Sequence, residues 1–202
     1  MPRRLSIDIE HIHIRGDPSL LSEPVSDIDR RLQELANDTE YMRSILLRYS
    51  STNQGEYYSN CVDAIHELSE TIYDVSEILN DLQHQVVEYH IKINILDGKI
   101  PSAPSPQRHN VQKIIVQTNT GEVEFNREEM LQVHNALTIY LEQVYLDMNK
   151  LNEDTENIGF VWRDEQYKLF YSCIEEVSYS ISAGCRKLEE YRDYLASIIS
   201  NI

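Results

Sequence analysis

The sequence is poor in basic residues and in the residues that interrupt helices. Its 202 residues include only six glycines and six prolines, so long helices with few loops are expected. It has 18 Lys and Arg against 34 Asp and Glu, a net charge of -16 that repels nucleic-acid phosphates and anionic lipid headgroups alike. Neither nucleic acid nor a membrane surface is therefore expected as a partner.

Other absences narrow the class of protein further. No apolar run approaches the length of about 20 residues that spans a bilayer, and the N-terminus lacks the apolar core of a signal peptide. The sequence therefore predicts a cytoplasmic protein without a membrane span, for which any export would use a route that reads no cleavable signal peptide. The three cysteines, Cys61, Cys173 and Cys185, have no metal-ligand spacing.

Apolar residues recur at alternating spacings of three and four near the end of the chain. They are Tyr167, Phe170, Ile174, Val177, Ile181, Leu188, Tyr191, Leu195, Ile198 and Ile202, with Gly184 completing the pattern. This spacing places one apolar stripe, here called the seam, along a helix, and a partner helix must cover it. The run from 162 to 202 is therefore predicted to be a long helix of a bundle.

The same pattern occurs 109 residues earlier, at Cys61, Ile65, Leu68, Ile72, Val75, Leu79, Leu82, Val86, Tyr89 and Ile93. A shorter seam from 28 to 49 likewise repeats from 137 to 158. An insertion in one copy would rotate its stripe off the core, so the constant offset predicts a duplication. We expect a mainly α protein, a four-helix bundle of two strand-helix-turn-helix repeats, residues 1–97 and 111–202, joined by a proline-rich linker at 98–110.

Short alternating segments precede each helical hairpin. Residues 4–14 and 111–118 alternate apolar and polar side chains, the period of a β-strand. Ile114 and Val116 lie 109 positions after Leu5 and Ile7, so the strand belongs to the repeat. A small β ribbon is therefore predicted, with strand pairing within the chain or between chains both open.

No motif of an enzyme or of a cofactor site is present. The sequence has no Gly-rich phosphate loop and no nucleophile elbow. Asp63 with His66, and Asp81 with His84, have the spacing of helical metal ligands, but the pairs would lie roughly 27 Å apart on one helix. His11 and His13 would share one face of a strand, which is more commonly an exposed face than a zinc site. No catalytic residue, cofactor or metal is therefore predicted.

Two places on the second repeat stand out as candidate partner-binding sites. Gly184 replaces Val75 of the first repeat in mid-helix, where glycine costs about 1 kcal/mol relative to alanine, so either a neighbouring helix or a partner side chain is expected to approach it closely. Phe160, Val161 and Trp162 form an aromatic hairpin tip, where the first repeat has the polar residues 51–53. Such a tip either closes a bundle or anchors a partner.

The hairpin turns carry a partial motif. Residues 53–55 read Asn-Gln-Gly and residues 162–164 read Trp-Arg-Asp, so each turn keeps one half of Trp-x-Gly at equivalent positions. With the tandem hairpins at 26–94 and 128–202, this arrangement resembles the WXG family of type VII secretion systems. The family's C-terminal export tag, Tyr-x-x-x-acid beyond the last helix, is absent.

The resemblance implies a fused pseudo-dimer without catalytic activity. Such a protein would be an adaptor, chaperone or targeting partner that binds the helical region of an exported effector. Two other functions remain open. The charge of -16 suits an immunity protein that binds a cationic toxin, and exposed strands suit a structural subunit that assembles into a homo-oligomer.

Overall fold

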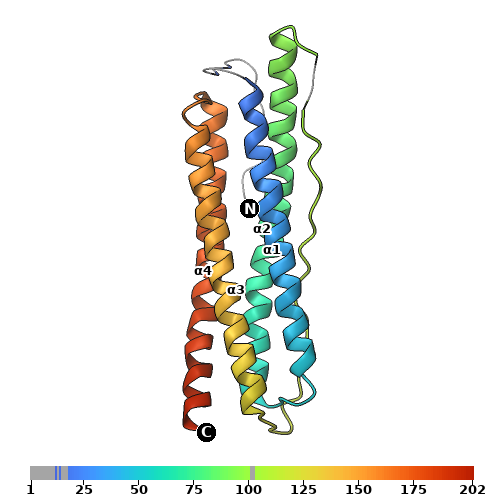
Figure 1. Ribbon diagram of the computed structural model, residues 1–202, viewed down its shortest axis with the longest axis vertical. Helices are drawn as coiled ribbons and strands as arrows, with labels where there is room; N and C mark the ends of the chain where they lie inside the picture. Colours follow the sequence, from blue (N-terminus) through green and yellow to red (C-terminus); the bar gives the residue numbers. More distant parts are fainter. Residues whose placement is uncertain (1–11, 13, 15–17, 101–102) are drawn as a thin grey trace. The chain divides into compact units, whose positions relative to one another are not determined.

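The computed structural model describes Ile12, Ile14 and residues 18–100 and 103–202. A 3-10 turn, η1 (Pro18–Leu21), leads into the helices α1 (Ser22–Tyr49), α2 (Glu56–Leu96), α3 (Arg127–Ile158) and α4 (Glu165–Asn201) (Figure 1). The predicted mainly helical bundle is confirmed. The described residues form no β-strand and contain two isolated β-bridges, Ile14 with Trp162 and Gln54 with Glu124.

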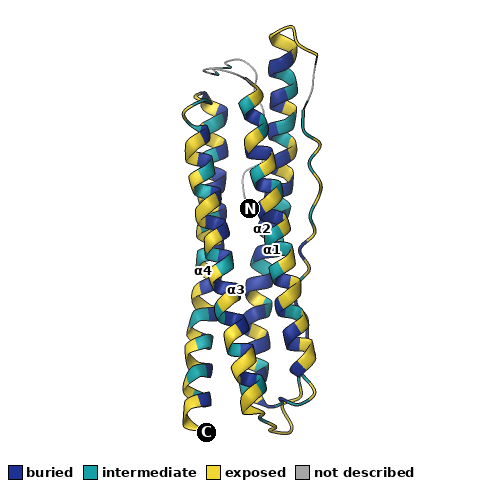
Figure 2. Cartoon of the chain, in the orientation of Figure 1, coloured by how far each residue is buried: buried dark blue, intermediate teal, exposed yellow. Residues whose placement is uncertain are grey.

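The seams form the hydrophobic core. All ten seam residues predicted in α2 are at most 5% exposed, and buried positions recur along every helix in Figure 2. Near the end of α4 the buried stripe departs from the predicted seam, because Ile199 is buried whereas the predicted seam residue Ile198 is only partly buried. A helix of 3.6 residues per turn drifts away from a strict 3.5-residue repeat, which explains the shift.

The chain divides into two compact units, each of which is described by itself. Unit 1 comprises residues 1–34, 75–110 and 147–179, and unit 2 comprises residues 35–74, 111–146 and 180–202. Each unit therefore contains a segment of all four helices. The boundaries at 97 and 111 divide the sequence by its predicted repeats, whereas these units divide the chain by contacts.

Unit 1 encloses a charged group within its core. The Arg31 guanidinium on α1 lies 3.2 Å from the carboxylate of Asp147 on α3 and also pairs with Glu34, and the Arg31 and Asp147 side chains are only 6% and 5% exposed. Burial, followed by the neighbouring Glu34 carboxylate, raises the pKa of Asp147 to about 7, and Arg31 opposes the shift. The core of this unit thus contains an ionisable group.

Unit 2 has neutral hydrogen bonds in its core. The hydroxyls of Thr39 on α1 and Tyr140 on α3 are 3.0 Å apart and buried. The Tyr191 hydroxyl on α4 donates to the backbone carbonyl of Tyr57 on α2. These bonds satisfy polar groups that burial would otherwise leave without a partner.

Local chemistry explains where the helices begin and end. The Asn126 side chain accepts from the backbone N–H of Glu129 and caps α3. In a capping box, the N–H of Asn126 would donate to the Glu129 carboxylate. Here Asn126 N–H donates to the Asn53 side chain instead, and the Glu129 carboxylate accepts from Asn53 and Thr52, which lie in the turn between α1 and α2. At the end of α2, Gly98 adopts φ +70°, a left-handed conformation that ends helices and that glycine adopts without strain.

The structure differs from the prediction at residues 111–118, which form no strand. In unit 1, the Asn80 side chain on α2 bonds both the backbone N–H and the carbonyl of His109. In unit 2, the Ser69 hydroxyl accepts from Ile114 N–H and His66 Nδ1 lies 2.7 Å from the Ile114 carbonyl. Side chains of α2 therefore take the place of a partner strand. The other predicted strand, 4–14, lies outside the described residues except for Ile12 and Ile14.

Candidate partner-binding site

Trp162 belongs to the interior of unit 1. It is 2% exposed, and its indole stacks on the ring of Tyr89 with centroids 5.0 Å apart. The ring of Phe170 on α4 lies 5.5 Å from it. The indole thus packs between α2 and the start of α4 and does not form part of the accessible surface.

Asp164 fixes the indole and begins α4. Its Oδ1 accepts from the indole N–H of Trp162 at 2.7 Å and from the backbone N–H groups of Gln166 and Tyr167. The hydroxyl of Tyr89 donates to its other oxygen. One carboxylate therefore caps a helix and fixes the side chain that closes the turn.

Phe160 is the exposed aromatic residue of the same turn, with 68% of its surface accessible. The backbone that carries it is ordered by hydrogen bonds, because Phe160 N–H donates to the Asn157 carbonyl and Val161 N–H donates to the Ile158 carbonyl. Trp162 N–H donates to the same Ile158 carbonyl. The turn therefore exposes a large apolar side chain to solvent on a fixed backbone.

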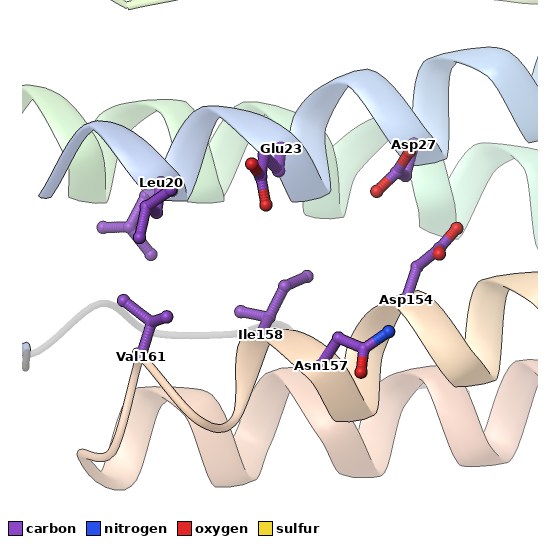
Figure 3. Close-up of a pocket in the computed structure, with 8 residues that line it drawn as sticks. Leu20, Glu23, Asp27, Asp154, Asn157, Ile158 and Val161 are labelled. Carbon is purple, nitrogen blue, oxygen red and sulfur yellow. The ribbon is translucent and has the colours of Figure 1, made fainter. Parts of the chain in front are cut away.

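Beside this turn, unit 1 contains a pocket of about 140 Å³ between α1 and α3 (Figure 3). One part of its wall is apolar and consists of Leu20, Leu21, Ile158 and Val161. The other part is polar and consists of Glu23, Asp27, Asp154 and Asn157. In Figure 3, Leu20 lies across the pocket from Val161, and the carboxylates of Asp27 and Asp154 face each other. We call this cavity the acidic pocket.

The described residues that line the acidic pocket carry an excess of negative charge. Three of the described residues that line it are acidic and none is basic. Arg30 on α1, outside the lining, lies 2.7 Å from Asp27 and 3.7 Å from Asp154, with half of its side chain exposed. Burial, followed by repulsion from Asp154, raises the pKa of Asp27, although Arg30 opposes the shift. Arg30, together with a smaller effect of Arg31 on Asp27, therefore compensates the three described carboxylates only in part.

Gly184, the fourth candidate residue, lies in unit 2, whereas the turn and the acidic pocket lie in unit 1. A β-carbon at this position would lie 3.0 Å from a methyl group of Leu68 and 3.5 Å from the hydroxyl of Thr71, both on α2. The missing side chain thus allows α2 and α4 to approach closely within unit 2. The space at Gly184 is filled by the protein itself.

The cysteine thiols are buried, and the described residues with metal-binding side chains do not cluster. Burial raises the pKa of Cys61 and of Cys185 to about 12, so both thiols are protonated at neutral pH. No group of three or more His, Cys, Asp or Glu among the described residues could hold a metal ion. His66 contacts the backbone carbonyl of Ile114, and His11 and His13 lie outside the described residues.

The sequence predicted the aromatic turn but not the acidic pocket. Because α1 begins at Ser22, Asp27 lies within the helix and can face α3. A signal was present in Glu23 and Asp27, since like charges four residues apart on a helix repel each other and destabilise it. Asp154 is distant in the sequence, and only the folded chain shows that it faces them.

Comparisons with known proteins identify no family for this chain. No protein-family model, no curated protein and no solved structure matches the chain. Within the part of the chain that the structure describes, no helix has the length and apolar character needed to cross a membrane.

Proposed function

We propose that this chain is a non-catalytic helical adaptor that binds a protein partner through the end of unit 1. The observation that carries the proposal is Phe160, a large aromatic side chain that is 68% exposed on an ordered turn. A fixed, exposed aromatic group next to a pocket is typical of an interface hot spot. Val161 belongs to the same surface because it lines the acidic pocket, whereas buried Trp162 supports the turn from below.

A duplication, as the sequence suggests, is supported by the way the two units correspond. Adding 109 to residues 1–34 and 75–93 of unit 1 gives 110–143 and 184–202, which fall almost entirely within the ranges 111–146 and 180–202 of unit 2. Subtracting 109 from residues 147–179 of unit 1 gives 38–70, within the range 35–74 of unit 2. Each unit would then combine one half of each repeat, as expected for two hairpins related by a pseudo-twofold axis.

The two turns support the same relation. Asn53 and Trp162, 109 positions apart, are both buried, at 0% and 2% exposure. The turn at Gln54 forms its bridge with Glu124, which precedes the second repeat's helices, whereas Trp162 forms its bridge with Ile14, which precedes the first repeat's helices. Each turn thus contacts the leading segment of the other repeat, as a fused pseudo-dimer would require.

The role in type VII secretion is proposed from the resemblance to WXG proteins. Its basis is the split motif, with Trp162 in one turn and Gly55 in the other. Gly55 has φ +117°, a conformation that residues with a side chain rarely adopt. In this proposal, the partner is the helical targeting region of an exported effector.

Affinity capture from the producing cell, with identification of the bound proteins by mass spectrometry, tests the adaptor function. Phe160→Ala should lose an effector that the wild type captures. Tyr179→Ala is the matched control, because Tyr179 is 71% exposed, also lies in unit 1 and is outside the turn and the acidic pocket. Capture of the same effector by Phe160→Ala and the wild type would contradict the proposed surface.

The immunity function is the second candidate, and the net charge of -16 favours it. A protein with that charge would associate rapidly with a toxin whose active site is cationic. The two functions differ in their consequences for the partner. An immunity protein inhibits the purified partner's toxic activity, whereas an adaptor leaves that activity unchanged and is needed for export.

A further inference from the structure

We propose that the acidic pocket receives a cationic side chain, a lysine or arginine, from the segment of the partner protein that packs against Phe160. That the cation belongs to a protein segment rests on the proposed adaptor function. The preference of the pocket for a cation follows from its own residues and can be measured without any partner.

The first reason is charge. Glu23, Asp27 and Asp154 line the acidic pocket, and no basic side chain is among its described lining residues. One oxygen of Asp154 is enclosed and accepts no hydrogen bond from a described residue, and the Arg30 guanidinium lies 3.7 Å from it, beyond hydrogen-bond distance. A buried acceptor without a donor destabilises the protein, and a donor that enters the pocket removes that cost. A lysine ammonium carries three donors and an arginine guanidinium five.

The second reason is the distribution of apolar and acidic residues. Leu20, Ile158 and Val161 lie at one end of the pocket, next to the start of α1 and the end of α3, and the carboxylates of Asp27 and Asp154 lie farther along these two helices (Figure 3). Lysine and arginine have an apolar stem and a charged end, and they bury the stem while the end meets polar groups. The two parts of the pocket thus match the two parts of such a side chain.

Other occupants fit less well. An anion would meet three carboxylates, and an entirely apolar side chain would leave the carboxylates desolvated without compensation. For a metal ion, the described carboxylates do not converge in a group of three. A single cation with an apolar stem satisfies both parts of the lining.

The test is a methyl-NMR titration of the full chain with small mimics of these side chains. The probes are n-butylammonium for lysine, n-propylguanidinium for arginine and n-butanol as a neutral compound of similar size, and the reporters are the methyl groups of Ile158 and Val161. We expect both cations to shift these methyl signals in a saturable way, with n-butanol at least threefold weaker. Comparison of the two cations shows whether lysine or arginine is preferred.

Three variants assign the effect to the carboxylates. Asp154→Asn should weaken cation binding by about three- to fivefold, the effect of losing one partly exposed charge pair. Glu153→Gln is the control, because it removes the same charge from an exposed neighbouring residue outside the lining and should change binding by less than twofold. Arg30→Gln should strengthen cation binding, since Arg30 competes for Asp27 and Asp154. If Asp154→Asn fails to fold, Asp27→Asn replaces it.

Three outcomes would overturn the inference: no methyl shift with either cation, equal binding of n-butanol, or equal loss in Asp154→Asn and Glu153→Gln. Equal binding of n-butanol would identify an apolar occupant instead. These outcomes are distinct from a failure of the adaptor function. If Phe160→Ala captures every protein that the wild type captures, but the cations still bind as expected, the cation preference of the pocket is supported and the proposed partner interface is contradicted.

Discussion

Two aromatic residues of one turn have opposite environments, since Phe160 is 68% exposed and Trp162 is 2% exposed. Trp162→Ala should lower the free energy of unfolding by about 3–5 kcal/mol, as truncation of a buried tryptophan usually does. Phe160→Ala should change it by no more than about 0.5 kcal/mol. Urea unfolding monitored by circular dichroism measures both values. A Trp162→Ala protein as stable as the wild type would show that the indole does not close unit 1.

Asp147 should make the stability of the protein depend on pH. Burial and Glu34 raise its pKa to about 7, whereas an aspartate in an unfolded chain has a pKa of about 3.9. The folded state therefore retains this proton to higher pH than the unfolded state does. The free energy of unfolding should fall as pH rises from about 4 to about 7, by at most about 1.4 kcal/mol per pH unit, and this group adds no further change above that range.

Urea unfolding at several pH values between 5 and 7 measures this slope. In Asp147→Asn the contribution of the group disappears, so the difference in stability between the wild type and the variant should change steadily across the range. Glu153→Gln, which removes an exposed carboxylate from the same helix, should keep the wild-type slope. Parallel pH profiles of stability for the wild type and Asp147→Asn would contradict this prediction, because they would mean that the Asp147 carboxylate has the same pKa in the folded and the unfolded state.

At the scale of elements, the Asn80 side chain of α2 holds the backbone of the linker at His109, beside side-chain contacts of Arg108 with Glu77 and of His109 with Asp29. Asn80 bonds both polar backbone groups of His109, with distances of 2.8 and 3.2 Å. Asn80→Ala should speed hydrogen exchange of the His109 amide by about tenfold or more, because one lost hydrogen bond of about 1.4 kcal/mol corresponds to that factor. The Ile114 amide, bonded to Ser69, is the internal control. Unchanged exchange at His109 would mean that Asn80 does not hold the linker.

The sequence predicted helices more accurately than strands, for a physical reason. A seam determines both the helix and its buried face, so the α2 residues from Cys61 to Ile93 were all placed correctly in the core. Alternation indicates only an extended backbone. Ile114 and Val116 are buried and Ile115 is 71% exposed, as in a strand, yet the surface beneath them is a helix. The partner of an extended segment is non-local, and the alternation does not identify it.

For the candidate site too, the sequence predicted local features but not contacts between distant residues. The exposed Phe160 and the tight position of Gly184 lie where local spacing placed them, on a turn and in mid-helix. Whether Trp162 closes the bundle or faces a partner depended on Tyr89, 73 residues away, whose ring covers the indole. The acidic pocket likewise needed Asp27 and Asp154 from two helices. Contacts between residues distant in the sequence made the difference in both cases.

For the whole molecule, we expect a single unfolding transition. Every helix continues through both units without a break; α2, for example, passes from unit 2 to unit 1 between Asp74 and Val75. Trp162 is the only tryptophan and lies in unit 1, so its fluorescence reports on that unit alone, whereas circular dichroism reports on all helices. The two probes should give the same midpoint in urea. Separate midpoints would show that the units unfold independently.

An export assay tests the adaptor function most directly. The gene is deleted in the producing cell, and the secreted amount of the effector captured by the wild-type protein is measured. Deletion should abolish secretion while the effector still accumulates inside the cell, and the wild type and Tyr179→Ala should restore it, whereas Phe160→Ala should not. Normal secretion after deletion, or full restoration by Phe160→Ala, would contradict an adaptor that acts through the exposed turn of unit 1.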